Sequence, residues 1–191
     1  MTVSVFIDGA AGTTGLEIRE RLADRSEIAL IALTDADRKD ATKRAEALND
    51  ADFVILCLPD AAAREAVALI DNPHTRVIDA STAHRVANGW TYGFAELEPS
   101  QAQAIADAPR VSNPGCWPTG YLALVRPLVR AGLIPADWQL SAGGASGYSG
   151  GGKAMIAEFE TGGALPYRAY GLTLKHKHVP EMTRHSGLHV P

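Results

Sequence analysis

The chain has 191 residues, of which 46% are hydrophobic and 21% charged, with a formal net charge of -4 at pH 7. This composition is typical of a soluble globular protein with one large or two small domains. Scattered cations argue against nucleic acid or an anionic membrane as partner, and no apolar run reaches the ~20 residues of a membrane span. Two cysteines and no signal-peptide pattern favour a cytoplasmic protein without a disulfide framework.

The N-terminal segment has the pattern of a strand, a glycine loop and a helix. An apolar run at 3–7 is followed by Gly9, Gly12 and Gly15 in GxxGxxG spacing, and helical periodicity continues over 16–23. In this context small residues let the backbone approach a pyrophosphate, whose charge the helix N-terminus receives. The loop therefore favours dinucleotide binding over a merely structural turn, although GxGxxG is the commoner spacing.

The second strand predicted, 28–33, is followed by residues that bear on the choice of cofactor. An acidic residue about 20 positions after the loop would hold a ribose 2′-hydroxyl and favour NAD, whereas a nearby arginine would suit a 2′-phosphate. Asp35 and the pair Arg38-Lys39 therefore point in opposite directions. A solvated loop is the alternative to both.

Further strands and helices alternate up to residue 85. Apolar strands are predicted at 53–59 and 76–79, and helices at 41–48 and 61–70; Cys57 lies inside the first of these strands and is expected in the core. This alternation predicts a doubly wound α/β domain. Ligands in such sheets bind beyond the carboxyl ends of the strands, so the polar residues 79–85 are candidates for a site, with a capped turn as the alternative.

A cysteine turn follows a predicted helix at 99–107 and a short strand at 110–111. Cys116 comes directly after Pro114-Gly115, and the apolar segment 121–133 reads as a helix. A thiol at such a helix start feels the positive end of the helix dipole, which stabilises the thiolate. The alternative is a small buried hydrophobe.

The remaining third begins with an expected strand at 138–142 and a glycine-rich stretch that ends in Lys153, a residue suited to an anionic substrate group. A helix is predicted at 154–161. His176 and His178 occupy alternate positions of an expected strand end within 171–182, which would place both rings on the same side. Two histidines without a third ligand make a weak metal site, so we expect no metal and favour an acid–base role beside a thiolate.

Together these features suggest that a thiolate attacks an acyl phosphate and that a nicotinamide hydride then reduces the thioester. Five motifs in order closely resemble the N-acetyl-gamma-glutamyl-phosphate reductase family of arginine biosynthesis, in its shorter-chain form, within the wider semialdehyde dehydrogenase group. They are GAAGTTG at 9–15, DASTAHR at 79–85, SNPGCWPT at 112–119, SGYSGGGK at 146–153 and HKHVPE at 176–181.

This resemblance implies a role for individual residues. Cys116 would be the nucleophile and His176 or His178 the acid–base group, with a slight preference for His176. The family cofactor is NADP, which favours Arg38 or Lys39 over Asp35 as the residue that decides the cofactor. The remaining expected cofactor contacts are Gly9, Ala11, Gly12, Thr13, Thr14 and Gly15, and the expected substrate contacts are Ser81, Arg85, Asn113 and Lys153.

The fold expected is a Rossmann-type nucleotide domain at 1–115, followed by a partial α+β substrate domain at 116–191. Chains of that family are longer, so we expect the substrate domain to be incomplete and a homo-oligomer only if it is complete. Aspartate-semialdehyde dehydrogenase, which shares the cysteine turn, is the first alternative. A catalytically inactive nucleotide-binding fragment is the second. A Cys-His hydrolase, which needs no nicotinamide, is the third, and the glycine loop in its strand–helix setting counts against it.

Overall fold

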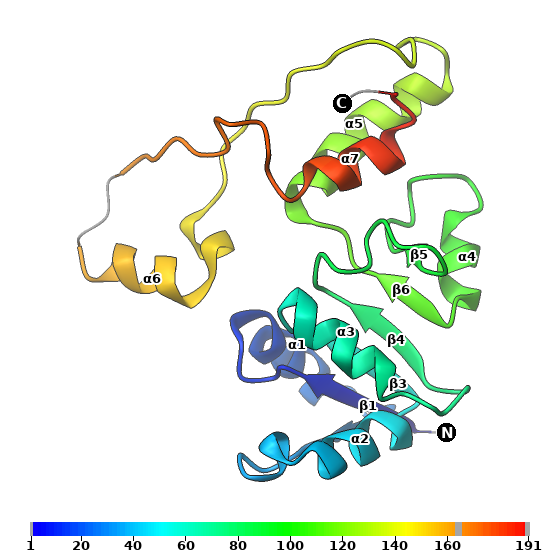
Figure 1. Ribbon diagram of the computed structural model, residues 1–191, viewed down its shortest axis with the longest axis vertical. Coiled ribbons are helices and arrows are strands. Elements are labelled where there is room, and N and C mark those ends of the chain that lie inside the picture. The colour runs from blue at the N-terminus through cyan, green and yellow to red at the C-terminus, as the bar shows by residue number, and fades with distance from the viewer. Residues whose placement is uncertain (1, 163–165, 190–191) are drawn as a thin grey trace.

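Six parallel strands form one sheet in the computed structural model, which describes residues 2–162 and 166–189 (Figure 1). Their order is β2-β1-β3-β4-β6-β5. From β1 the chain moves outward to β2 and then crosses back to β3 on the other side of β1, so the topological switch point lies between β1 and β3. The doubly wound α/β prediction is confirmed. The strands are β1 (Val3–Asp8), β2 (Ile28–Ile31), β3 (Phe53–Leu56), β4 (Arg76–Asp79), β5 (Thr91–Tyr92) and β6 (Arg110–Ser112).

Helices cover both faces of this sheet, as a buried parallel sheet requires. On one face α2 (Ala41–Asp50) and α3 (Asp60–Ala68) pack against β1, β3 and β4, while α1 (Thr13–Ala23) crosses the other face (Figure 1). The central strands align in register and present one row of side chains to α2 and α3. The main core residues there are Phe6, Leu48, Val54, Leu56, Ala63 and Val77.

Beyond β4 the chain builds the part that carries the cysteine turn. Two short helices complete the part of the chain that contains the sheet: η1 (Asp37–Lys39) follows β2, and α4 (Gln101–Asp107) precedes β6. α5 (Cys116–Arg130) then starts at the carboxyl end of β6, and α7 (Val179–Ser186) lies beside it (Figure 1). The start of α5 is therefore held between the sheet and a helix that comes more than sixty residues later.

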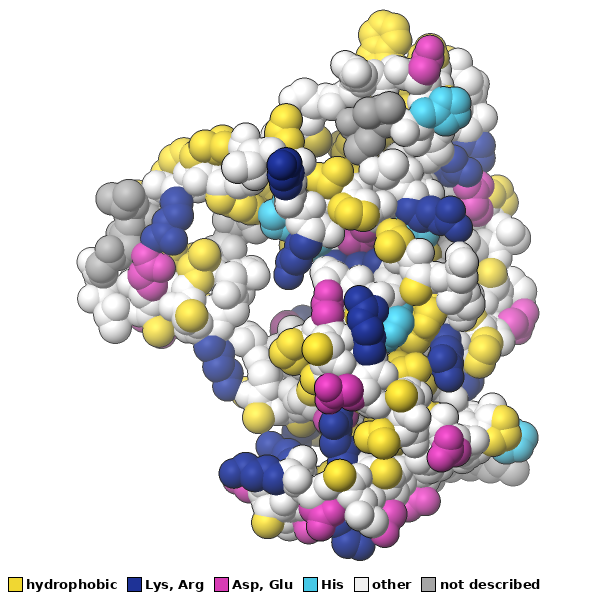
Figure 2. Space-filling model, in the orientation of Figure 1, with side chains coloured by type: hydrophobic (Ala, Val, Ile, Leu, Met, Phe, Trp, Pro, Cys, Tyr) yellow, Lys and Arg dark blue, Asp and Glu magenta, His cyan; other side chains and the backbone are white. Residues whose placement is uncertain are grey.

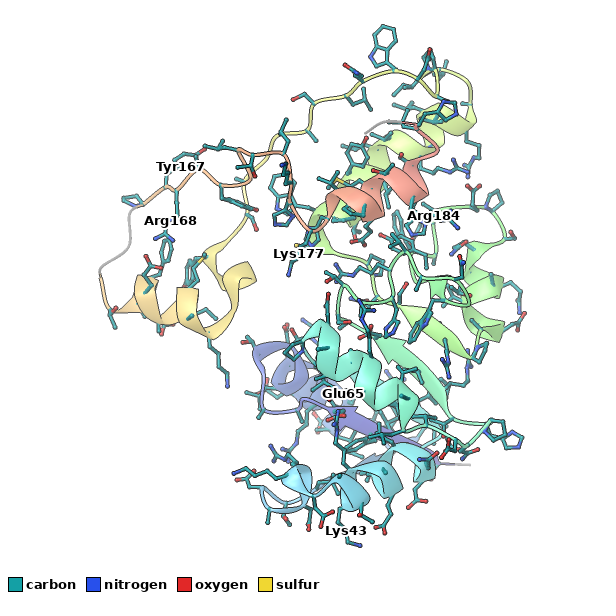
Figure 3. All side chains as sticks on the ribbon, in the orientation of Figure 1. Lys43, Glu65, Tyr167, Arg168, Lys177 and Arg184 are labelled. Carbon is teal, nitrogen blue, oxygen red and sulfur yellow. The ribbon has the colours of Figure 1, made fainter. Side chains whose placement is uncertain are left out.

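The segment between α5 and α7 stands apart from the sheet. It contains η2 (Tyr148–Gly151) and α6 (Gly152–Glu160), joined to the rest by extended stretches, and a hollow separates it from the body of the molecule (Figures 1 and 2). Within this segment, Tyr148 stacks on Phe159 with ring centroids 4.6 Å apart, and Arg168 forms an ion pair with Glu158 (Figure 3). Within the residues described here, no helix is both long and apolar enough to cross a membrane.

Two strand predictions in this last third are wrong. Residues 138–142 form irregular chain, and residues 171–182 lead through turns into α7. The stronger signal was Pro180 in the first turn of α7, with Gly187 at φ 82° after its end, since proline favours the first helical turn and glycine the residue that terminates a helix. Val190 and Pro191, the last residues of the expected second domain, lie outside the described residues.

Candidate active site

The glycine loop makes a close turn between β1 and α1. Gly9 has φ 90°, and a Cβ on it would lie 2.3 Å from the carbonyl oxygen of Cys57. A Cβ on Gly15 would lie 2.5 Å from the carbonyl oxygen of Gly9, so helix and strand approach closely there. At Gly12 the nearest atom would be 3.4 Å away, which is ordinary contact. The fold therefore requires glycine at positions 9 and 15, whereas a side chain at position 12 would meet no close protein contact, so a ligand can approach there.

The first turn of α1 fits the pyrophosphate of a dinucleotide. Its N-cap, Gly12, offers no side-chain acceptor, and the neighbouring Ala11, Thr13 and Thr14 are exposed. Backbone N–H groups at an uncapped helix start are donors for an anion, and the helix dipole favours its charge. The residues present therefore fit the pyrophosphate of a dinucleotide cofactor.

Lys153 lies at this loop. Its Nζ donates to the carbonyl oxygen of Ala11 at 2.6 Å, and an open cavity of about 410 Å³ lies between α1 and α6, lined by Thr13, Leu16 and Lys153 among others. The side chain thereby joins the separate α6 segment to the glycine loop. Lys153 was predicted to meet an anionic substrate group; the contact that the structure gives it is with the loop of the expected cofactor.

The two residues that point to opposite cofactors are paired with each other. Arg38 Nη2 lies 3.0 Å from Asp35 Oδ1, and Arg38 Nε donates to the carbonyl oxygen of Leu33 at 3.3 Å. Both side chains therefore lie beyond the carboxyl end of β2, and β2 is the neighbour of β1, the strand that leads into the glycine loop. Asp8, at the end of β1, is bound by Arg44 Nε at 2.8 Å, a pair that sequence reasoning missed.

The cysteine turn is fastened to the end of β4. The N–H of Asn113 donates to the carbonyl oxygen of Asp79 at 2.7 Å, and Thr119 Oγ1 donates to that of Gly115 at 2.8 Å. Cys116 is the first residue of α5 and is exposed, whereas Cys57 directly follows β3 and is half-buried, and this burial raises its thiol pKa to about 11. Cys116 thus lies at a helix start, as the sequence predicted, whereas the prediction that Cys57 lies inside a strand and in the core is wrong, because β3 ends one residue earlier and Cys57 is only half-buried.

The loop after β4 is built around a fully buried carboxylate. Asp79 accepts from the N–H and Oγ of Ser81 at 2.9 and 2.7 Å, and its Oδ2 lies 2.6 Å from His84 Nδ1. His84 also stacks on Trp90, with centroids 4.0 Å apart. Ser81, a predicted substrate contact, is buried and bonded to Asp79, so in this structure it shapes the loop.

Arg85, another predicted substrate contact, is the loop's link to the cysteine turn. Its guanidinium donates to the carbonyl oxygens of Asn113 and Ala80 at 2.9 and 3.0 Å, and Nη1 lies 3.2 Å from Glu181 Oε2. Buried among these partners, Arg85 joins β4, the cysteine turn and α7. Sequence reasoning quoted Glu181 as the last residue of the histidine motif but assigned it no role.

The two histidines adjoin the same turn. The ring centroids of His176 and His178 are 4.6 Å apart, and the N–H of His178 donates to His176 Nδ1 at 3.3 Å. His178 is buried, its Nδ1 has no partner among the described residues, and desolvation lowers its pKa to about 4, so its ring is neutral near pH 7. His176 is half-buried beside Tyr170, whose hydroxyl oxygen accepts from Trp117 Nε1 at 2.6 Å.

The predicted residues therefore form two groups. The cysteine turn brings together Cys116, Asn113, Arg85 and the histidine pair, while the glycine loop gathers the cofactor candidates and Lys153. In the ranges 2–162 and 166–189 no cluster of three or more potential ligand side chains is placed to hold a metal ion. This arrangement can hold a dinucleotide at one place and a thiol with a neighbouring imidazole at another.

Two family models match the chain. The semialdehyde dehydrogenase NAD binding domain matches residues 4–105, and the semialdehyde dehydrogenase dimerisation domain matches residues 116–190. The chain belongs to the semialdehyde dehydrogenase family. The NAD binding domain match contains the glycine loop and the strands up to β5, β6 lies between the two matches, and the second match begins at Cys116.

Curated relatives of this semialdehyde dehydrogenase chain carry one name. The chain is 57% identical over 97% of its length to a Burkholderia orbicola protein named N-acetyl-gamma-glutamyl-phosphate reductase. It is 57% identical over 98% to a Pseudomonas putida protein named N-acetyl-gamma-glutamyl-phosphate reductase 2. It spans 60% and 61% of the lengths of these relatives.

Among solved structures, aspartate semialdehyde dehydrogenase II from Vibrio cholerae is similar over 98% of this chain and 67% of its own, with a TM-score of 0.61 and 16% identity. Aspartate semialdehyde dehydrogenase from Francisella tularensis is similar over 83% of this chain and 48% of its own, with a TM-score of 0.57 and 14% identity. At such low identity these likenesses concern the fold, and they agree with the family assignment.

Proposed function

We propose that this protein is an NADP-dependent N-acetyl-gamma-glutamyl-phosphate reductase, which forms N-acetylglutamate semialdehyde and phosphate in arginine biosynthesis. The observation that carries the proposal is the exposed thiol of Cys116 at the start of α5, directly after the Gly115 that His178 approaches, in a chain 57% identical to relatives of that name. A thiol at a helix N-terminus is favoured as thiolate and suits covalent catalysis.

The side chains at the turn would divide the work as follows. His176, which is half-buried and reaches solvent, takes the proton of the Cys116 thiol. The sulfur forms a bond to the acyl carbon, and the bond from that carbon to the phosphate oxygen breaks, so that phosphate leaves with its electron pair and receives the proton from His176. When bound, the nicotinamide cofactor supplies the hydride that reduces the thioester carbon. The C–S bond then breaks, and the thiolate recovers a proton from solvent.

His178 is the less suitable acid–base group because its pKa of about 4 makes it a weak base at neutral pH. Its neutral ring instead packs against the turn. Arg85 and Lys153 would attract the anionic groups of the substrate, Arg85 from beneath the turn and Lys153 from the glycine loop, and Ser81 and Asn113 would contact the substrate or shape its loops.

The cofactor site would hold NADP through the glycine loop, with Arg38 at the 2′-phosphate. A guanidinium at the end of β2 can bind a phosphate with two parallel hydrogen bonds, which supports this assignment. We further propose a nucleotide domain at 1–115, a catalytic and substrate domain from 116, a homo-oligomer formed through the second region, and a cytoplasmic location. The matched dimerisation domain supports the oligomer.

The test is phosphate-dependent NADP reduction by the purified protein, with N-acetylglutamate semialdehyde and aspartate semialdehyde run side by side. Turnover of the acetylated aldehyde, lost when phosphate is omitted, is the expected result. Turnover of aspartate semialdehyde alone would assign the other semialdehyde dehydrogenase activity. NADPH binding, measured by fluorescence, without turnover of either aldehyde would indicate a nucleotide-binding protein that does not catalyse this reaction.

A further inference from the structure

A carboxylate from α7 is buried directly beneath the cysteine turn. Glu181 is only 2% exposed, and its oxygens accept from three donors on separate segments: Tyr92 Oη at 2.6 Å, the N–H of Gly115 at 2.7 Å and Arg85 Nη1 at 3.2 Å. The proposed reaction does not use this residue. We propose that Glu181 is a positioning residue, which holds the Cys116 turn, Arg85 and α7 in the geometry that the thiol needs.

A carboxylate suits this place better than a neutral acceptor would. The Arg85 guanidinium is buried, and its other two bonds go to backbone carbonyl oxygens, which carry no charge. A buried cation without a counter-ion is strongly destabilising, whereas a hydrogen-bonded pair compensates most of the cost of desolvation. Glu181 therefore neutralises the cation and fixes its direction toward the turn.

Three side chains converge on Gly115, the residue before the thiol. A Cβ on Gly115 would lie 2.7 Å from Arg85 Nη1, 2.9 Å from Glu181 Oε2 and 2.9 Å from His178 Nε2. Because Glu181 also accepts the N–H of Gly115, any movement of its carboxylate displaces the backbone that carries Cys116. Misplacement of a reacting group by about 1 Å can lower a rate by roughly 100-fold.

Glu181 carries the main negative charge in this buried cluster, because the titratable groups that face it are cationic or neutral. Arg85 faces it from the loop after β4, and Tyr92 from β5, where burial and the bond to Glu181 raise the tyrosine pKa well above its ordinary value. From its own helix, His178 and His185 face it, and burial lowers the pKa of both rings, so they are neutral near pH 7. The carboxylate thus offsets the positive charge of the buried Arg85 at the turn.

The proposal rests on Cys116 as nucleophile in the proposed function, and two variants of Glu181 separate charge from geometry. E181Q keeps the shape but removes the negative charge, so the positive charge of Arg85 beneath the turn is no longer offset. We expect iodoacetamide to alkylate Cys116 roughly threefold faster at pH 7, since a cation that is no longer paired promotes the reaction of a nearby sulfur. The kcat of E181Q should fall roughly tenfold or more, with KM for the aldehyde little changed.

E181D keeps the charge but is one methylene shorter, so it cannot reach both Arg85 and Gly115. We expect its kcat to fall by a similar factor while the alkylation rate stays within about twofold of the unmodified protein. The matched control is E65Q, an exposed glutamate on α3, which should change neither quantity (Figure 3). Cys57, resolved from Cys116 by peptide mass spectrometry, serves as the internal reference.

The proposal is overturned if E181Q matches E65Q in both kcat and alkylation, because a merely structural carboxylate would alter thermal stability alone. If E181Q does not fold, E181D decides: normal kcat in the folded variant overturns the proposal, and reduced kcat with unaltered alkylation supports it. If the unmodified protein turns over neither aldehyde, the proposed function fails. The alkylation rates then still test Glu181, since they need no substrate.

Discussion

Two helices start at the carboxyl ends of parallel strands with nearly the same backbone, yet they have different surroundings. Gly12 caps α1 with φ -75° and ψ 164°, and Gly115 caps α5 with φ -70° and ψ 151°, both without a side-chain cap. At α1 the side chains that follow are exposed threonines. At α5 the buried carboxylate of Glu181 accepts a hydrogen bond from the N–H of Gly115, and the exposed thiol of Cys116 follows.

This difference teaches how one backbone motif can serve two tasks. A bound anion needs free N–H donors and room for close approach, which the glycines of the first loop provide. A reacting thiol needs a fixed direction, which the second turn obtains from side chains of the loop after β4 and of α7. The first site is therefore built from neighbouring residues, and the second from segments far apart in the chain.

The largest effect should come from the thiol at the start of α5. Cys116→Ser should lower kcat by roughly 10³-fold or more, because the hydroxyl is a far weaker nucleophile, while NADPH still binds at the start of α1. The measurement is phosphate-dependent NADP reduction, with cofactor binding followed by fluorescence. Cys57→Ser is the matched control and should retain activity; equal losses in both variants would refute the division into two sites.

Two glycines of the first loop should separate ligand contact from folding. Gly12→Ala places a methyl where only a ligand approaches, so NADPH affinity should fall about tenfold with an unchanged melting temperature. Gly15→Ala forces a Cβ to within 2.5 Å of a backbone oxygen, and such overpacking should cost about 1–3 kcal/mol of unfolding free energy. Calorimetry and cofactor titration check both; a destabilised Gly12→Ala would mean that the loop is structural.

The buried His178 beside the second turn should make stability depend on pH. Its pKa is about 4 in the folded protein and about 6.5 when unfolded, so the unfolded chain binds more protons between these values. The unfolding free energy should therefore rise with pH between about 4 and 6.5, by up to about 1.4 kcal/mol per unit, and then level off. Urea unfolding at several pH values measures it. His178→Gln should flatten this slope, and His176→Gln should not.

The same contrast explains what the sequence could predict. The glycine loop, the alternating strands and helices, and Cys116 at a helix start follow from local patterns of spacing and periodicity. α7 was mistaken for a strand because alternation around His176 and His178 was preferred over Pro180 and Gly187.

The contacts of Glu181 with Tyr92, Arg85 and Gly115 join residues 66 to 96 positions apart in the chain. No local pattern encodes such a meeting; it follows from β4, β6 and α7 coming together in the fold. The same holds for Lys153, whose bond to Ala11 spans 142 positions. Local signals thus point to candidate residues for the chemistry, and the tertiary structure shows which of these candidates meet.

The smallest effect should come from the pair beside the first helix start. Arg38 is bound to Asp35, so a 2′-phosphate must compete with that carboxylate, and the net gain from the guanidinium is modest. Arg38→Ala should weaken NADPH binding about threefold to fivefold and leave NADH binding unchanged, whereas Asp35→Ala, which frees the arginine, should strengthen NADPH binding by about twofold to threefold. Paired titrations with NADPH and NADH measure both. If Arg38→Ala weakened the two cofactors equally, the arginine would support the loop and would not read the 2′-phosphate.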